Sequence, residues 1–312
     1  MDSATRVGPA VRLRRLLWLG ALLASGAAAE PYYLIVAGIG GDPHYEQRFT
    51  QQAEALAEAA RRTTGNEEQV LVLSGDDATQ ESVRAAFARL AETVGSTDTL
   101  IVFLIGHGSF DGDDYKLNLK GPDLTGDALG ELLSSVPASA QLVMNATSAS
   151  GAVLEGWTTD GRTVITATRS GNERNATRFA EHWIAALSSD EADLDKNGLV
   201  SAQEAFDYAS RKVADSYESE GVLATEHPQI AGEGAQRLTV ARLTARPSET
   251  PELARLSARM AEIEGDLEAL RQRRDQMDSD AYLNELQALL LQLAAVQQEI
   301  DRAQAALESS ED

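Results

Sequence analysis

The chain has 312 residues, of which 43% are hydrophobic and 24% charged, so it can form one large domain with a substantial core and an appendage. Its net charge is −22, and the first 29 residues carry four Arg and one Asp, which leaves −25 on the remainder. So acidic a surface repels phosphate backbones and anionic lipids. The composition therefore argues against a protein that binds nucleic acid or a membrane surface.

Residues 1–29 have the pattern of a secretory signal peptide. Basic residues come first, an apolar run follows at 16–23, and three alanines at 27–29 supply a cleavage site. The alternative is an uncleaved anchor, but the apolar run is far shorter than the roughly 20 residues that span a bilayer. We therefore expect a mature protein that starts at Glu30, has no membrane span, and is exported to the periplasm or the extracellular space.

Short apolar runs alternate with amphipathic segments over the next two hundred residues. Strands are expected at 32–37, 69–73, 99–105, 141–144 and 163–167, with 238–243 as a candidate sixth strand and a small edge hairpin at 115–119. Helices are expected at 45–63, 79–91, 125–135, 176–187 and 201–217. This alternation predicts an α/β domain over 30–245, with a mainly parallel sheet of about six strands covered by helices on both faces.

Two loop motifs follow neighbouring predicted strands. One holds Gly106-His107-Gly108-Ser109, and the other holds the small residues from Ala146 to Gly151, with Ser148 among them. The carboxyl ends of parallel strands meet at one edge of a sheet, so His107 and Ser148 should lie side by side. A serine hydroxyl becomes a nucleophile when a neighbouring base takes its proton. The bland alternatives are a structural histidine and a tight junction of small residues.

These two motifs resemble those of the caspase/legumain group of cysteine peptidases, and legumain-type enzymes more closely. The similarity covers about 30–245 and extends to Val36-Ala37-Gly38, to Ala167-Thr168 and to Asn172-Glu173. It implies a caspase-like fold and acyl transfer to a peptide or protein substrate. In that reaction the amides of Gly108 and Ser148 would stabilise the oxyanion.

The chain departs from the family at three positions that the resemblance assigns to chemistry. It has no cysteine, and Ser148 stands where the family has its nucleophilic cysteine. Gly40 stands at the position of the orienting Asn, which leaves Asp111, Asp113 and Asp114 as nearby candidates to orient His107. The substrate-gripping Arg falls near Glu46. The resemblance places Glu46, Ser170 and Glu173 around the specificity pocket, and such an acidic rim suits a basic side chain.

Residues 193–204 fit the EF-hand calcium loop at every specified position. The predicted ligands are Asp193, Asp195, Asn197, Leu199 through its carbonyl, Ser201 and Glu204. Gly198 permits the sharp turn, and the apolar Val200 would anchor the loop to a neighbour. The alternative is an acidic turn between two helices, because Asp, Asn and Gly favour turns. A lone hand has no second hand to pack against, so we expect modest affinity and a structural calcium ion.

The last sixty residues have a different pattern. Residues 246–250 form a linker, and Pro251 stands at the first position of a helix. Apolar residues then recur at three/four spacing on either side of the polar stretch Asp278-Ser279-Asp280. This predicts an antiparallel coiled-coil hairpin over 251–308. Neither leg can bury its stripe alone, so the hairpin self-associates, binds a coiled-coil partner or covers the domain.

Three functions remain open from the sequence. The chain is an exported serine variant of a cysteine peptidase, a peptidase-like pseudoenzyme that binds peptides, or a calcium-stabilised scaffold that acts through its hairpin. The His107–Ser148 pair favours the first two. The acidic tail with its heptads favours the third.

Overall fold

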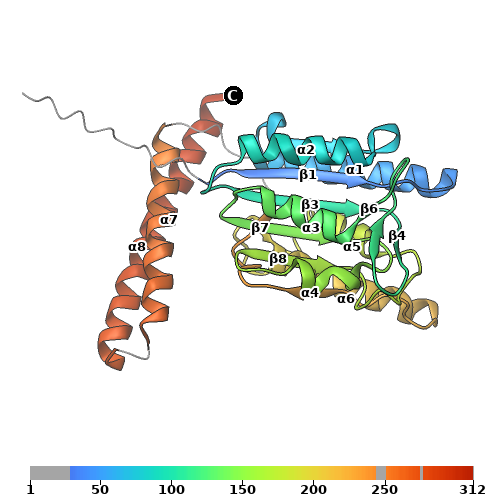
Figure 1. Ribbon diagram of the computed structural model, residues 1–312. Coiled ribbons are helices and arrows are strands. Elements are labelled where there is room, and N and C mark those ends of the chain that lie inside the picture. Colours follow the sequence, from blue (N-terminus) through green and yellow to red (C-terminus); the bar gives the residue numbers. More distant parts are fainter. Residues whose placement is uncertain (1–28, 244–250, 275–276, 312) are drawn as a thin grey trace, which may run out of the picture.

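The computed structural model describes residues 29–243, 251–274 and 277–311. The predicted signal peptide lies outside the described residues, apart from its last residue, and so does the whole of the predicted linker. The first 215 described residues form an α/β domain, and residues from 251 onwards form a pair of long helices (Figure 1).

A six-stranded sheet is the centre of the domain, with strand order β10-β8-β7-β3-β1-β2. Five strands are parallel: β1 (Pro31–Ala37), β2 (Val70–Leu73), β3 (Thr99–Ile105), β7 (Ala140–Asn145) and β8 (Arg162–Thr166). The edge strand β10 (Gln229–Ala231) runs antiparallel to β8. The predicted fold class, a mainly parallel sheet of about six strands with helices on both faces, is confirmed.

The prediction that 238–243 forms a sixth strand of this sheet was wrong. Residues Thr239–Arg242 do form a strand, β11, but it pairs with β9 (Leu199–Ser201) in a separate two-stranded sheet. The edge strand of the main sheet is β10 instead. It has three residues and follows a proline, so its apolar run is too short to predict a strand from the sequence.

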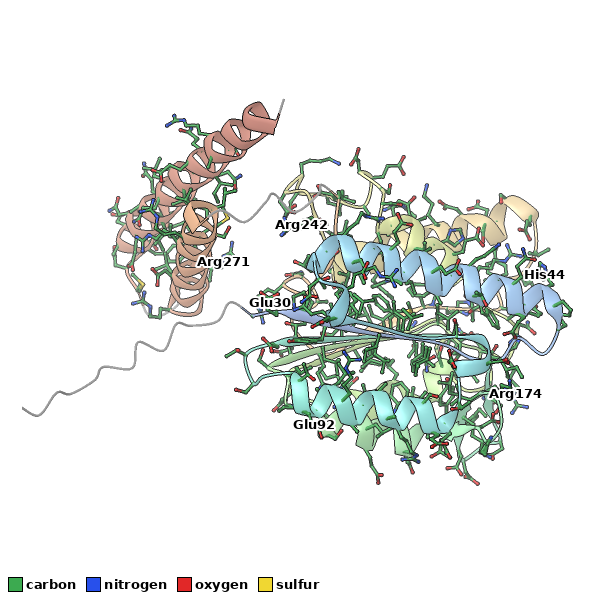
Figure 2. The ribbon with its side chains drawn as sticks, turned by 90° about the horizontal axis from the view of Figure 1, so that it is seen from above. Glu30, His44, Glu92, Arg174, Arg242 and Arg271 are labelled. Atoms are coloured by element: carbon green, nitrogen blue, oxygen red, sulfur yellow. The ribbon has the colours of Figure 1, made fainter. Side chains whose placement is uncertain are left out.

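Alternation along the strands divides the core into two layers. On β1, Tyr33 and Ile35 face a cluster with α1 (Pro43–Thr64), α5 (Phe179–Ala186) and α6 (Ala202–Glu220). On the same strand, Leu34 and Val36 face a cluster with α2 (Gln80–Thr93), α3 (Gly126–Ser135) and α4 (Leu154–Trp157). Figure 2 shows α1, which carries His44, on one side of the sheet and α2, which carries Glu92, on the other. Strands buried on both faces read as continuous apolar runs, and these do.

Helix starts follow capping chemistry. Thr79, the N-cap of α2, accepts a hydrogen bond from the Ser82 amide, and Thr125, the N-cap of α3, accepts one from the Ala128 amide. The helix expected at 176–187 begins three residues later, at Phe179. The buried carboxylate of Glu226 caps it by accepting the amides of Arg178 and Phe179, which are 48 and 47 residues away, so local sequence does not reveal the contact.

The C-terminal helices α7 (Pro251–Gln272) and α8 (Ser279–Glu311) pack antiparallel. Leu253 and Leu256 on α7 are buried against Ile300 on α8, and Arg273 pairs with Glu285 near the turn. Three other residues of α8, Leu283, Leu290 and Leu291, are exposed. Among the described residues, no helix is long and apolar enough to cross a membrane.

Candidate functional site

His107 and Ser148 follow β3 and β7, which are paired in parallel at the centre of the sheet. The two loops touch. A Cβ atom on Gly108 would lie 2.4 Å from the Ser148 carbonyl oxygen, so only glycine permits this approach. The structure thus brings together the three residues His107, Gly108 and Ser148. A fourth residue of the same edge, Asn118, directly follows β5 (Tyr115–Leu117) and donates its amide to the His107 carbonyl.

The imidazole of His107 is held by α1 and by the turn after β1. Its ring centroid lies 4.7 Å from that of Tyr45 and 5.1 Å from that of Phe49, both edge-on. Burial lowers the pKa of His107 below its ordinary value, a hydrogen bond to the Gly40 backbone opposes this, and the charge of Arg48 lowers it further. The ring is therefore neutral at pH 7, with one nitrogen able to accept a proton.

The aspartates considered for orienting His107 have another role. Asp111 accepts the amides of Asp113 and Asp114 and pairs with Lys116, which closes the turn between β4 (Gly108–Phe110) and β5. These hydrogen bonds lower the pKa of Asp111 to about 2. The partner of His107 is instead a backbone carbonyl, which a sequence pattern cannot identify.

Ser148 is deeply placed, with 2% of its surface exposed. Within the described part of the chain, no hydrogen bond joins its hydroxyl to His107. Such contacts are often long in proteins without substrate and tighten when substrate binds. The geometry puts the two side chains on adjoining loops without a formed base–nucleophile contact.

The turn that carries Ser148 is strained and firmly held. Ala149, which is fully buried, has φ 58°, a left-handed conformation that side-chain-bearing residues avoid. Its amide donates to the Glu173 carbonyl at 2.8 Å, and the Gly151 amide donates to Thr168 Oγ1 at 2.8 Å. Strain of this kind persists only where surrounding contacts impose it, and it concentrates at functional sites.

A buried polar network supports the same turn from behind. Tyr115 Oη lies 2.6 Å from Thr147 Oγ1, and Thr147 Oγ1 donates to Asn145 Oδ1 at 2.8 Å. Burial raises the pKa of Tyr115 to about 12, so the phenol stays protonated and donates. The β4–β5 hairpin is thereby tied to the end of β7.

The three predicted substrate-binding residues hold loops rather than an open rim. Glu46 accepts the Gly40 amide at 2.9 Å, and a Cβ at Gly40 would lie 2.3 Å from the Glu46 nitrogen, so an Asn does not fit there. The Ser170 carbonyl accepts from Thr168 Oγ1 and its amide lies against Gly151. The Glu173 side chain is 11% exposed; it forms an ion pair with Arg169 and contacts the His227 ring.

Two features of this edge were missed in the sequence. His227, which belongs to no sequence motif, lies with Nδ1 2.6 Å from Glu173 Oε1. Arg48 and Gln52 line a cavity of about 10 Å³ between α1 and the ends of β3 and β7, room for one water molecule. Gln52 Oε1 is buried there without a hydrogen-bond partner. No motif marks either feature, because each joins segments that are distant in the sequence.

The carboxylates of the predicted calcium loop lie close together. Ligand atoms of Asp193, Asp195 and Glu204 all lie within 4.8 Å of one another, and Gly198 takes the left-handed turn with φ 78°. Burial and the neighbouring charges of Glu204 and Asp193 raise the pKa of Asp195. Crowded oxygen ligands of one sign are the donor set that Ca²⁺ prefers, so these residues fit the ion.

The other predicted ligands are arranged around the same loop. Asn197 Oδ1 accepts the Leu199 amide at 2.7 Å, and Ser201 is the N-cap of α6, with its hydroxyl bonded to Glu204. A strand from elsewhere in the domain, not a second hand, packs against the loop. Val200 is fully buried, and β9 pairs with β11 where a second hand would otherwise stand.

No family model and no curated protein matches this chain. Solved structures with a similar fold include a structural-genomics protein from Geobacter sulfurreducens, at 16% identity and a TM-score of 0.46, covering 69% of this chain and 100% of that one. Caspase-1 from Spodoptera frugiperda is also similar, at 12% identity and a TM-score of 0.46, covering 71% of this chain and 92% of that one.

Proposed function

We propose that this is an exported caspase/legumain-like protein whose His107–Ser148 site hydrolyses peptides weakly or not at all, and that one calcium ion stabilises it. The observation that carries the proposal is the contact between the loops after β3 and β7, where Gly108 lies against the Ser148 carbonyl. An imidazole kept neutral and a hydroxyl on adjoining loops are the parts that acyl transfer needs.

In the catalytic form of the proposal, the free ring nitrogen of His107 takes the Ser148 proton as the hydroxyl oxygen adds to the peptide carbonyl. The amides of Gly108 and Ser148 stabilise the oxyanion. The protonated imidazole then gives its proton to the leaving amine. Water hydrolyses the acyl ester and restores the serine.

The expectation of weak or absent hydrolysis rests on Ser148 itself. Its hydroxyl is almost fully enclosed, and a serine is not ionised at neutral pH, whereas a cysteine is already a few per cent thiolate. A peptide-binding pseudoenzyme is therefore the alternative within the same site.

The proposed selectivity differs from the one that an acidic rim would give. The carboxylate of Glu46 accepts the Gly40 amide, and that of Glu173 contacts Arg169 and His227, so neither is free to bind a substrate side chain. We therefore expect no preference for a basic side chain. Matched peptides with Asn or Lys before the scissile bond measure this, and a preference for Lys contradicts it.

Single-cysteine variants provide the decisive test, because the chain has no other thiol. Ser148→Cys in the mature protein should react with an electrophilic peptide probe much faster than Ser109→Cys, a matched variant at an exposed serine. The reaction should slow in a His107→Gln background, because the imidazole lowers the thiol pKa. Wild-type turnover lost in Ser148→Ala indicates an enzyme; reaction of the cysteine variant alone indicates a pseudoenzyme. Equal rates for the two cysteines contradict the site.

The calcium proposal is tested by thermal unfolding. With a dissociation constant of about 10⁻⁴ M, 1 mM calcium adds about 1.4 kcal/mol to the free energy of unfolding, and the gain grows with concentration. Glu204→Gln should remove it, whereas Asp207→Asn, on the exposed face of α6, should keep it. An unchanged melting curve in the wild type excludes calcium.

A calcium-stabilised scaffold is the second candidate function. It is favoured by the exposed Leu283, Leu290 and Leu291 on α8, since exposed leucines on one helix often mark a contact surface.

Export is a proposal that rests on residues 1–29. The intact mass of the exported protein should correspond to a start at Glu30, and a retained N-terminus contradicts it.

A further inference from the structure

The partner strand of the calcium loop belongs to the last part of the domain before the C-terminal helices. In the β9–β11 pair, Leu199 stands opposite Arg242 and Val200 opposite Ala241. The Leu243 amide also donates to the Gly198 carbonyl at 3.0 Å. Residues 198–201, the second half of the loop, are thus fixed by residues 239–243.

Strand β11 also contacts β1 and α1, the first two elements of the domain. Val240 is fully buried, and its carbonyl accepts from Tyr33 Oη at 3.2 Å. The Arg242 amide donates to Thr63 Oγ1 near the end of α1, at 3.1 Å. The strand is therefore a shared element, with the calcium loop on one side and the sheet domain on the other.

The chain continues from β11 toward the helical hairpin. Leu243 is the last described residue of the domain, and α7 begins at Pro251, eight positions later. What fixes β11 therefore fixes the point from which the hairpin leaves the domain.

We propose that calcium binding and the pairing of β9 with β11 are coupled, so that calcium stabilises the position of β11, the last strand before the helical hairpin. This rests on the proposed calcium site. The Leu199 carbonyl, a predicted ligand, lies in β9, so holding it at the ion restricts the strand that β11 pairs with. Two events that order the same strand favour each other, and the coupling is reciprocal. A change in affinity of 5-fold or more is the usual scale of such coupling.

The Leu243 position allows a matched pair of variants in the full mature chain. Leu243→Pro deletes the amide that donates to Gly198, and proline suits the extended backbone that precedes it. Leu243→Ala removes the same side chain and keeps the amide. Calcium affinity by titration calorimetry should fall 5-fold or more in Leu243→Pro relative to Leu243→Ala.

Hydrogen exchange supplies a second readout. Calcium should slow exchange of the amides at 239–243 in the wild type, and should not do so in Glu204→Gln. Equal calcium affinity in the two Leu243 variants, together with unchanged exchange at 239–243 on calcium binding, overturns the coupling while leaving the calcium site in place. Failure of the wild type to bind calcium overturns the site itself, and the coupling with it.

Discussion

The imidazole of His227 and the carboxylate of Glu173 form a close pair, with Nδ1 2.6 Å from Oε1. The same carboxylate accepts the His227 amide and the Arg169 amide and forms an ion pair with Arg169 Nε, so four nitrogen atoms meet on one side chain. The Glu173 backbone carbonyl accepts the Ala149 amide beside Ser148. Glu173 therefore connects the β8 loop, the segment before β10 and the candidate nucleophile.

The first prediction concerns this connection. Glu173→Gln keeps the size of the side chain but leaves a single acceptor oxygen for the four nitrogen atoms around it. Hydrogen bonds to charged groups contribute about 1.5–3 kcal/mol, and the free energy of unfolding in urea should fall by about that much. Arg169→Gln is the control: its side chain is 62% exposed, so its loss should cost below about 1 kcal/mol. Equal losses in the two variants contradict a central role for Glu173.

The second prediction concerns the left-handed backbone of Ala149. Ala149→Gly removes a strain of about 1 kcal/mol, which offsets the entropy that glycine adds to the unfolded chain, so stability should change little. The control is Ala146→Gly, at a buried alanine with ordinary backbone geometry, where the same substitution should destabilise by about 1 kcal/mol. Urea unfolding of both variants measures the difference. If Ala149→Gly destabilises as much as the control, the turn carries no strain.

The third prediction concerns acid stability. Because burial lowers the pKa of His107 in the folded protein, the unfolded chain binds more protons below the ordinary value of 6.5. The stability that the folded protein owes to a neutral His107 is complete above pH 6.5 and is lost as the pH falls through 6.5 toward the pKa of His107 in the folded protein. His107→Gln should lose less stability on acidification, measured as urea midpoints between roughly pH 5 and 8. Parallel pH profiles of the two proteins would show that His107 titrates normally.

The fourth prediction concerns the C-terminal helices. Their buried leucines pack within the pair, in a cluster separate from the two core layers of the domain. A chain ending at residue 245 should therefore stay folded, with an unchanged urea midpoint. It should also lose the self-association or partner contact that Leu283, Leu290 and Leu291 support, measured by sedimentation velocity.

The matched variant for this surface is Leu290→Gln with Leu291→Gln in the full chain. It changes the exposed face without touching the buried stripe. Association that survives both the truncation and the double substitution places the contact elsewhere. A truncated chain that unfolds shows instead that the helices cover the domain.

Much of the fold follows from the sequence alone, because its signals are local. The apolar runs at 99–105 and 141–144 could only be doubly buried strands, and Thr79 and Thr125 mark helix starts by hydrogen bonds that span three residues. The juxtaposition of His107 with Ser148 followed from the geometry of parallel strands, and the gathering of Asp193, Asp195 and Glu204 from the spacing of one loop.

Contacts between distant segments were decided only by the tertiary structure. These contacts are the hydrogen bond of His107 to the Gly40 backbone, the nitrogen atoms around Glu173, the carboxylate of Glu226 at the start of α5, and the pairing of β11 with the calcium loop. They join residues up to 67 positions apart. Backbone donors and acceptors are the same in every residue, so no residue type reveals them. Short strands such as β10 and β11 take their partners from burial and free edges, which exist only once the sheet has formed.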